Sequence, residues 1–147
     1  MWAMVNKEYA MKNLITTCAL AIGLFAGSVN AETYTCTLKP DAHDRGWISK
    51  TIVVNLNDKT GEILVNDILI QDVYDKPIPA KLVVNSDKRF TIKWDVKGLK
   101  NDRHQTIPRW MYRLTILKAR GNKAIVSAQA AGYFGTLGAS GKCRVSK

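Results

Sequence analysis

Alternation of apolar and polar residues is the feature of this sequence that most limits its fold. In the segment RFTIKWDV, residues 89–96, four apolar side chains would share one face of a strand, because successive strand residues point to opposite sides: Phe90, Ile92, Trp94 and Val96. Residues 50–57 and 109–118 alternate in the same way, and almost no stretch after residue 31 has helical periodicity. We therefore predict a fold built from short antiparallel strands.

Strand-like segments follow one another at steady intervals along the chain. The segments on either side of Asn66-Asp67 form either a tight hairpin or one strand with a bulge. Residues 73–79 cannot form a central strand, because their two prolines lack the backbone donor. Seven or eight strands predict an all-β fold, either a small antiparallel up-and-down barrel of the lipocalin-like type or a sandwich.

The beginning of the chain predicts an export signal. An apolar run over residues 14–26 follows Lys12 and leads to Val29-Asn30-Ala31, which is typical of cleavage after Ala31. The run is shorter than the roughly 20 apolar residues of a membrane-spanning helix. Residues 1–10 fit an upstream extension, so that translation starts at either Met1 or Met11. We expect residues 1–31 to be a signal peptide and residues 32–147 to be one periplasmic or secreted domain.

Two cysteines remain after the predicted cleavage, and they lie near opposite ends of the domain. Cys18 would leave with the signal peptide, whereas Cys36 and Cys143 would enter an oxidising compartment. Two cysteines allow one intramolecular bridge, and their separation differs from the Cys-x-x-Cys spacing of redox or metal pairs. We predict a structural disulfide between Cys36 and Cys143, which favours a closed barrel.

The C-terminal stretch GYFGTLGASGKCRVSK contains the pair Gly141-Lys142, as a phosphate-binding loop would. The interval from Gly135 to Gly141 is one residue too long for that motif, Cys143 replaces its hydroxyl residue, and the chain ends before a helix can follow. We predict instead a flexible loop over residues 132–141 that brings the last strand back to Cys36.

Catalytic and metal-binding patterns are weak in this sequence. Two predicted loops carry residue types that bind zinc or manganese, but these residues are also common in turns: Asp41, His43, Asp44, Asp102 and His104. The sequence has no G-x-S-x-G elbow and no evident pair of catalytic carboxylates. We predict a protein that is not an enzyme, with no catalytic residue, no metal site and no cofactor.

Basic residues suggest how the predicted domain binds. The chain carries a formal net charge of +10. Five cations occupy outward positions on or beside three strands and would form one stripe if those strands were neighbours: Lys81, Lys93, Lys97, Arg109 and Arg113. Such a stripe would bind an anionic envelope polymer, lipid head groups or an acidic protein, with no nucleic acid expected. The competing interpretation is a solvated sheet face that discourages edge pairing.

Two other functions stay open at this point. Trp94 and Trp110 would line the interior of a closed barrel, which predicts a carrier of a small apolar ligand, although inward aromatic residues are also ordinary core. The chain also resembles the periplasmic inhibitors of c-type lysozyme in size, in Tyr34-Thr35-Cys36, in a cysteine near its end, and in part of NSDKRFTIKWDVKG. It lacks the glycine and tyrosine of that family's motif. The resemblance implies an inhibitor of a cell-wall hydrolase.

Overall fold

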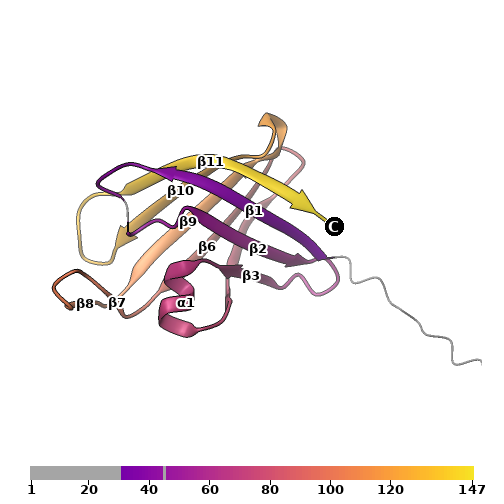
Figure 1. Cartoon of the computed structure of the whole chain (residues 1–147). Helices are drawn as coiled ribbons and strands as arrows, with labels where there is room; N and C mark the ends of the chain where they lie inside the picture. The colour runs from indigo at the N-terminus through magenta and orange to yellow at the C-terminus, as the bar shows by residue number, and fades with distance from the viewer. Residues whose placement is uncertain (1–30, 45) are drawn as a thin grey trace, which may run out of the picture.

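Nine strands form one antiparallel sheet that curls into a nearly closed barrel (Figure 1). The computed structural model describes residues 31–44 and 46–147, so the predicted signal peptide lies outside the described residues apart from Ala31. In chain order the elements are β1 (Ala31–Pro40), β2 (Thr51–Asn57), β3 (Ile63–Asn66), α1 (Ile68–Tyr74), β4 (Ile78–Pro79), β5 (Lys81–Asn85), β6 (Arg89–Val96), β7 (Leu99–Lys100), β8 (Thr106–Ile107), β9 (Trp110–Leu117), the 3-10 turn η1 (Lys118–Arg120), β10 (Lys123–Ala130) and β11 (Leu137–Ser146).

The order of the strands explains how the barrel closes. Around the sheet they run β4-β3-β2-β1-β11-β10-β9-β6-β5, and β7 pairs with β8 in a separate small hairpin. The two ends of this order, β4 and β5, are consecutive in the chain and are joined through Ala80. One extended segment therefore pairs first with β3 and then with β6. The predicted all-β class is confirmed, and of the two predicted architectures the barrel is the observed one.

Inward side chains fill the middle of the barrel, as the alternation predicts. Phe90 and Tyr34 are buried and stack with ring centroids 5.2 Å apart, although they come from β6 and β1. Trp94 and Tyr112 stack in the same way at 5.3 Å. Stacked aromatic pairs bury large apolar areas and are worth about 0.5–1.5 kcal/mol beyond that burial. These aromatic side chains therefore form part of the hydrophobic core in the middle of the barrel.

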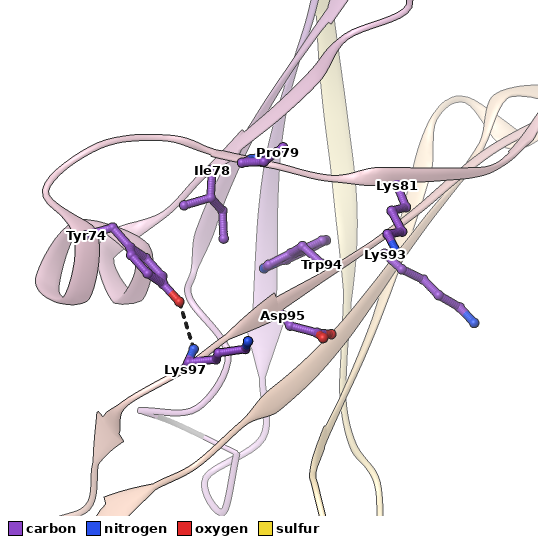
Figure 2. A pocket seen from close by; sticks show the side chains of 8 residues that line it. All are labelled: Tyr74, Ile78, Pro79, Lys81, Lys93, Trp94, Asp95 and Lys97. Carbon is purple, nitrogen blue, oxygen red and sulfur yellow. Dashed lines mark hydrogen bonds between the residues drawn. The ribbon is translucent and has the colours of Figure 1, made fainter.

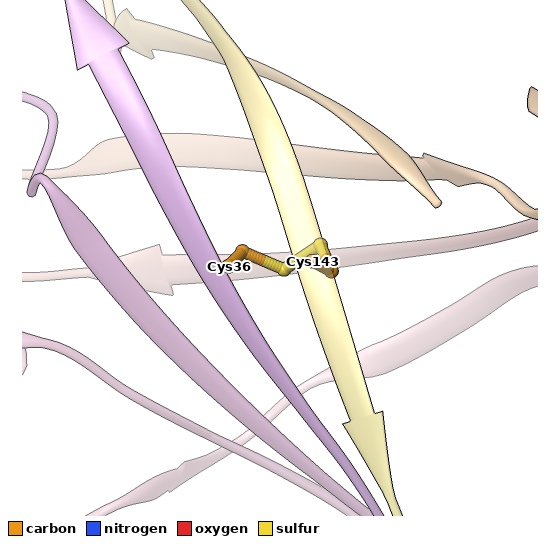
Figure 3. Close-up of a disulfide and its surroundings, with 2 residues drawn as sticks. All are labelled: Cys36 and Cys143. Carbon is orange, nitrogen blue, oxygen red and sulfur yellow. A yellow bond between two sulfur atoms is a disulfide. The ribbon is translucent and has the colours of Figure 1, made fainter. Parts of the chain in front are cut away.

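The first and last strands meet along a long seam that the disulfide crosses. Cys36 of β1 lies directly opposite Cys143 of β11 in the pairing register, and their sulfurs are bonded at 2.04 Å (Figure 3). The predicted bridge is confirmed. Because disulfides persist in oxidising compartments, the bond indicates that the protein works in one.

The structure corrects the prediction for residues 62–71, which form neither a hairpin nor a bulged strand. β3 ends at Asn66, and α1 follows. Asp67 caps this helix, since its side chain accepts a hydrogen bond of 2.8 Å from the Ile70 backbone N–H. Ile70 is buried and Leu69 packs against the core, which anchors the helix to the barrel. None of the helices in the described part of the chain is long and apolar enough to cross a membrane.

The C-terminal prediction also needs correction. β11 begins at Leu137, so Gly138 and Gly141 belong to the strand and the connecting loop is shorter than predicted. Gly141 lies opposite Leu38, and a Cβ atom at this position would overlap the backbone of Thr37. This glycine is therefore required for the close approach of β1 and β11, and it has no part in a phosphate-binding loop.

Candidate functional site

Three of the five predicted binding residues form one row on the outside of the barrel. Lys81 of β5 lies opposite Lys93 of β6, and Lys93 lies opposite Arg113 of β9. All three side chains are exposed. Since neighbouring strands are about 4.8 Å apart, the row presents cations at regular intervals across the strands. We call Lys81, Lys93 and Arg113 the cationic row.

The other two predicted binding residues lie beside this row. Lys97 follows the end of β6, and Arg109 precedes β9. Arg109 lies 3.8 Å from the Asp95 carboxylate, and both side chains are exposed, so this ion pair contributes little stability. Within residues 31–44 and 46–147, none of the remaining four cations makes an ion pair. The predicted stripe is therefore gathered on one face, with one of its cations held by an acid.

A gap in the barrel wall adjoins the cationic row. β5 pairs with β6 only as far as Lys93, so the following residues Trp94–Val96 have β9 as a partner on one side and no described strand on the other. The end of α1 covers part of this gap, where the Lys97 backbone N–H donates a hydrogen bond of 2.9 Å to the Tyr74 hydroxyl (Figure 2). What remains is a cleft of about 600 Å³.

The side chains around this cleft combine cations with an aromatic floor. Its lining includes Lys81, Lys93 and Lys97, with Asp95 as the acidic member, and we call it the cationic cleft. Figure 2 shows Trp94 in the middle of the group, between the lysines of β5 and β6 on one side and Tyr74 with Ile78 on the other. Trp94 is 3% exposed, and its indole N–H finds no hydrogen-bond partner among the described residues. A buried donor without a partner is unfavourable for the stability of the fold.

A second basic cluster lies on the outer face of β1, β10 and β11. Lys123 pairs with Lys142, and both line a shallow groove of about 560 Å³ together with Lys39 and Arg120. This groove has no aromatic lining residue in the described chain. The two clusters thus have similar charge but different surroundings, which makes the second a matched comparison for the first.

Two of the loop residues considered as metal ligands have structural roles. Asp44 is buried, and its carboxylate accepts a hydrogen bond of 3.0 Å from the Gly138 backbone N–H, which ties the β1–β2 loop to β11. His104 has a positive φ of 58° in the turn between β7 and β8, as turn residues often do. No cluster of three or more metal-binding side chains occurs in the described residues.

Burial raises the pKa of two side chains inside the barrel, Tyr112 and Asp67. Burial raises the pKa of Tyr112, with a smaller contribution from the negative charge of Asp67, and this phenol donates a hydrogen bond of 2.8 Å to the Trp47 carbonyl. Burial also raises the pKa of Asp67 above its ordinary value of 3.8, against the opposing effect of the hydrogen bond from Ile70. Both side chains are buried, and each is hydrogen-bonded to the backbone of another segment or of the helix that it caps.

The sequence did not indicate that Tyr74 and Trp94 belong to the cationic cleft. Tyr74 contributes because α1, which was not predicted, directs it toward the end of β6. Trp94 was predicted as an inward core residue, and it is one, but it also lines the cleft where β5 diverges. The prolines at 77 and 79 were the available signal, because they limit strand pairing at this point.

Comparison of the chain with protein-family models, curated proteins and solved structures finds no match.

Proposed function

We propose that this protein is a non-catalytic, exported binding protein whose cationic row and cationic cleft hold an anionic polymer of the cell envelope. The observation that carries the proposal is the register Lys81–Lys93–Arg113, which aligns three exposed cations on neighbouring strands. Periplasmic or secreted location is part of the proposal and is supported by the disulfide.

A linear polymer fits this face better than a flat lipid surface or a folded acidic protein. The cations form a line across three strands of a curved wall, so a flat surface would meet only part of it. A flexible chain with repeated phosphate or carboxylate groups follows such a line and places one group near each cation. Trp94 lines the cationic cleft beside this line and contributes an aromatic surface there. Lipid head groups and acidic proteins are therefore competing outcomes of the test.

The test compares two pairs of charge reversals that change the net charge equally. Lys93→Glu with Arg113→Glu disrupts the cationic row, whereas Lys123→Glu with Lys142→Glu reverses the matched pair on β10 and β11. Binding to a soluble teichoic-acid-type polyphosphate is measured by calorimetry at two salt concentrations. We expect binding to weaken steeply with salt and to be lost in the first variant only.

Two results would overturn the proposal. Equal loss in both variants would mean that net charge alone drives binding. Binding to vesicles of anionic lipid, or to an acidic protein, without binding to the soluble polymer would assign the face to another partner. Inhibition of a cell-wall hydrolase, which the sequence resemblance implies, is tested separately by adding the protein to a cell-lysis assay with c-type lysozyme.

A further inference from the structure

A second cleft opens at one end of the barrel, away from the cationic row. It is formed by the loop between β1 and β2, the β7–β8 hairpin and the loop between β10 and β11; Figure 1 shows the last two at the same end of the barrel. Its volume is about 640 Å³. We call it the mouth cleft and define it by its aromatic and amide side chains: Trp47, Asn101, Gln105, Trp110, Tyr133 and Phe134.

Aromatic rings provide flat apolar surfaces in the mouth cleft. Trp47 stacks on Trp110 with ring centroids 4.8 Å apart, which holds both rings in place. Tyr133 is 67% exposed and Phe134 is fully exposed, next to each other in the short loop before β11. Exposed aromatic neighbours beside a cleft are typical of a contact surface for a ligand, because burying them on binding is favourable.

Hydrogen bonds within the β7–β8 hairpin hold two amide side chains at the rim. The Asn101 side-chain oxygen accepts from the backbone N–H groups of Arg103 and Gln105, and its amide nitrogen donates to Gln105 Oε1 at 2.8 Å. This bond occupies the Gln105 oxygen and leaves its two N–H donors for another partner. Trp110 adds an indole N–H that is buried and unpaired among the described residues. The Gln105 amide and the Trp110 indole are therefore two donors of the mouth cleft for which the described residues supply no acceptor.

The mouth cleft and the cationic cleft differ in the charge of the side chains that line them. No Asp, Glu, Lys or Arg is present among the described residues that line the mouth cleft, and His43 is the basic side chain in this lining. A ligand that matches it is uncharged, has a flat face of C–H groups for the aromatic rings and carries oxygen acceptors at its edge. A sugar ring combines these properties, whereas a purely apolar ligand would leave the amide donors unpaired.

From these observations we infer that the mouth cleft binds an uncharged sugar ring of a glycan, stacked against its aromatic side chains and accepting hydrogen bonds from Gln105. This site is independent of the cationic row, so either site can fail without the other. Arg109 lies between them in the chain, flanked by Pro108 and Trp110 of the mouth cleft and paired with Asp95 of the cationic cleft.

The experiment uses the full exported protein and a trimer of N-acetylglucosamine as the probe, at about 0.5 M salt, where electrostatic binding is screened. Heteronuclear NMR follows the indole N–H signals of the tryptophans. We expect the sugar to shift the signals of Trp47 and Trp110 and to leave that of Trp94 unchanged. A polyphosphate at low salt should instead shift Trp94, which separates the two sites within one spectrum.

Three variants test which side chains bind the sugar. Phe134→Ala and Gln105→Ala should each weaken binding about fivefold or more, because each removes a direct contact. Ile68→Ala removes an apolar side chain from α1 that is also mostly exposed, at 74%, and should leave binding unchanged. The Lys93→Glu and Arg113→Glu double variant should also bind the sugar normally.

Several outcomes would overturn the inference. Absence of saturable sugar binding up to about 10 mM would do so, since even weak specific sites are detected at that concentration. Unchanged affinity in both Phe134→Ala and Gln105→Ala would place the sugar elsewhere. Binding of a proline-rich peptide or a hydrophobic dye without binding of the sugar would assign the cleft to a different ligand class.

Discussion

The two seams of this barrel differ in how they are held, and the difference explains where the candidate binding surface lies. At the β1–β11 seam the strands pair from Thr33 to Pro40 and are joined by the disulfide. At the β5–β6 seam the pairing covers only Lys81–Asn85 and contains an irregularity between Leu82 and Val84. One seam is fully paired, and the other is partly covered by a helix and side chains.

The incomplete seam carries unpaired cations beside an unpaired strand edge, whereas the basic cluster of β1, β10 and β11 lies on fully paired strands. A strand edge without a partner exposes backbone groups, and charged side chains next to such an edge discourage pairing with other chains. Lys93 and Lys97 flank the unpaired stretch of β6, because Lys93 is the last residue that pairs with β5 and Lys97 follows the end of the strand. The solvated-face interpretation and the binding proposal thus start from the same residues, and the difference between them is whether a polymer occupies the gap. Stability experiments on the two seams can sharpen the comparison.

Removing the disulfide should have the largest effect on stability. The bridge closes a sequence separation of 107 residues. In the chain-entropy model, a loop of this length corresponds to about 4–5 kcal/mol of stabilisation. We expect the Cys36→Ala and Cys143→Ala double variant to lose free energy of unfolding of that order in urea titrations. A loss below about 1 kcal/mol would show that strand pairing alone holds the closed seam.

Gly141→Ala should be the next largest change and acts on the same seam. The added Cβ would overlap the Thr37 backbone, which cannot move away as a flexible side chain would. We expect a loss of about 1–3 kcal/mol in the free energy of unfolding. Gly138→Ala is the matched control, because its nearest neighbour would be the Val126 carbonyl oxygen at an ordinary 3.8 Å. Equal losses in the two variants would contradict the role of close approach.

The sequence was sufficient to predict the closed seam. The alternation in residues 89–96 and 109–118 gave the inward and outward faces correctly, because a strand has only two faces. Only two cysteines remain after residue 31, so only one bridge was possible. Thr91 is an exception: it occupies an outward position but is buried, where its hydroxyl lies 3.2 Å from that of Thr115.

The open seam was much harder to predict, for physical reasons. The helix α1 has only seven residues, too few for a clear periodic signal, and its cap Asp67 also suits a turn. The alternation of inward and outward positions along each strand was enough to propose outward-facing cations. Their assembly into the cationic row depends on β5, β6 and β9 being neighbours, which no local sequence pattern determines. Trp110 was considered as a pocket residue, but the mouth cleft could not be assembled from the sequence because it combines three loops that are distant in sequence.

Tyr74→Phe should weaken the open seam by a smaller amount. The substitution removes the hydroxyl that accepts a hydrogen bond from the Lys97 backbone N–H and leaves the ring in place. Since this amide is exposed to water, we expect a loss of only about 0.5–1 kcal/mol in the free energy of unfolding. Hydrogen exchange of the Lys97 amide should become faster, while exchange along β1 stays unchanged. Unchanged exchange at Lys97 would mean that the tyrosine does not cover the gap.

Asp67→Asn should produce the smallest change in the free energy of unfolding. The pH dependence of this change tests whether burial disfavours the ionised form of Asp67, the N-cap residue of α1. Asparagine caps helices about as well as aspartate, so the capping contribution should differ by less than about 1 kcal/mol. Burial raises the pKa of Asp67 above 3.8, which means that the fold disfavours its ionised form. At neutral pH the variant should therefore be slightly more stable than the parent protein.

The same shift fixes the direction of the pH dependence. As the pH falls through the raised pKa of Asp67 toward 3.8, the parent protein takes up this proton more readily in the folded state and so gains stability, which the variant cannot do. Other carboxylates titrate in both proteins and cancel in the difference. The advantage of the variant in urea unfolding should shrink over this window and level off below it. An advantage that grows as the pH falls would mean that the hydrogen bond from Ile70, which favours the carboxylate, outweighs its burial beside the open seam.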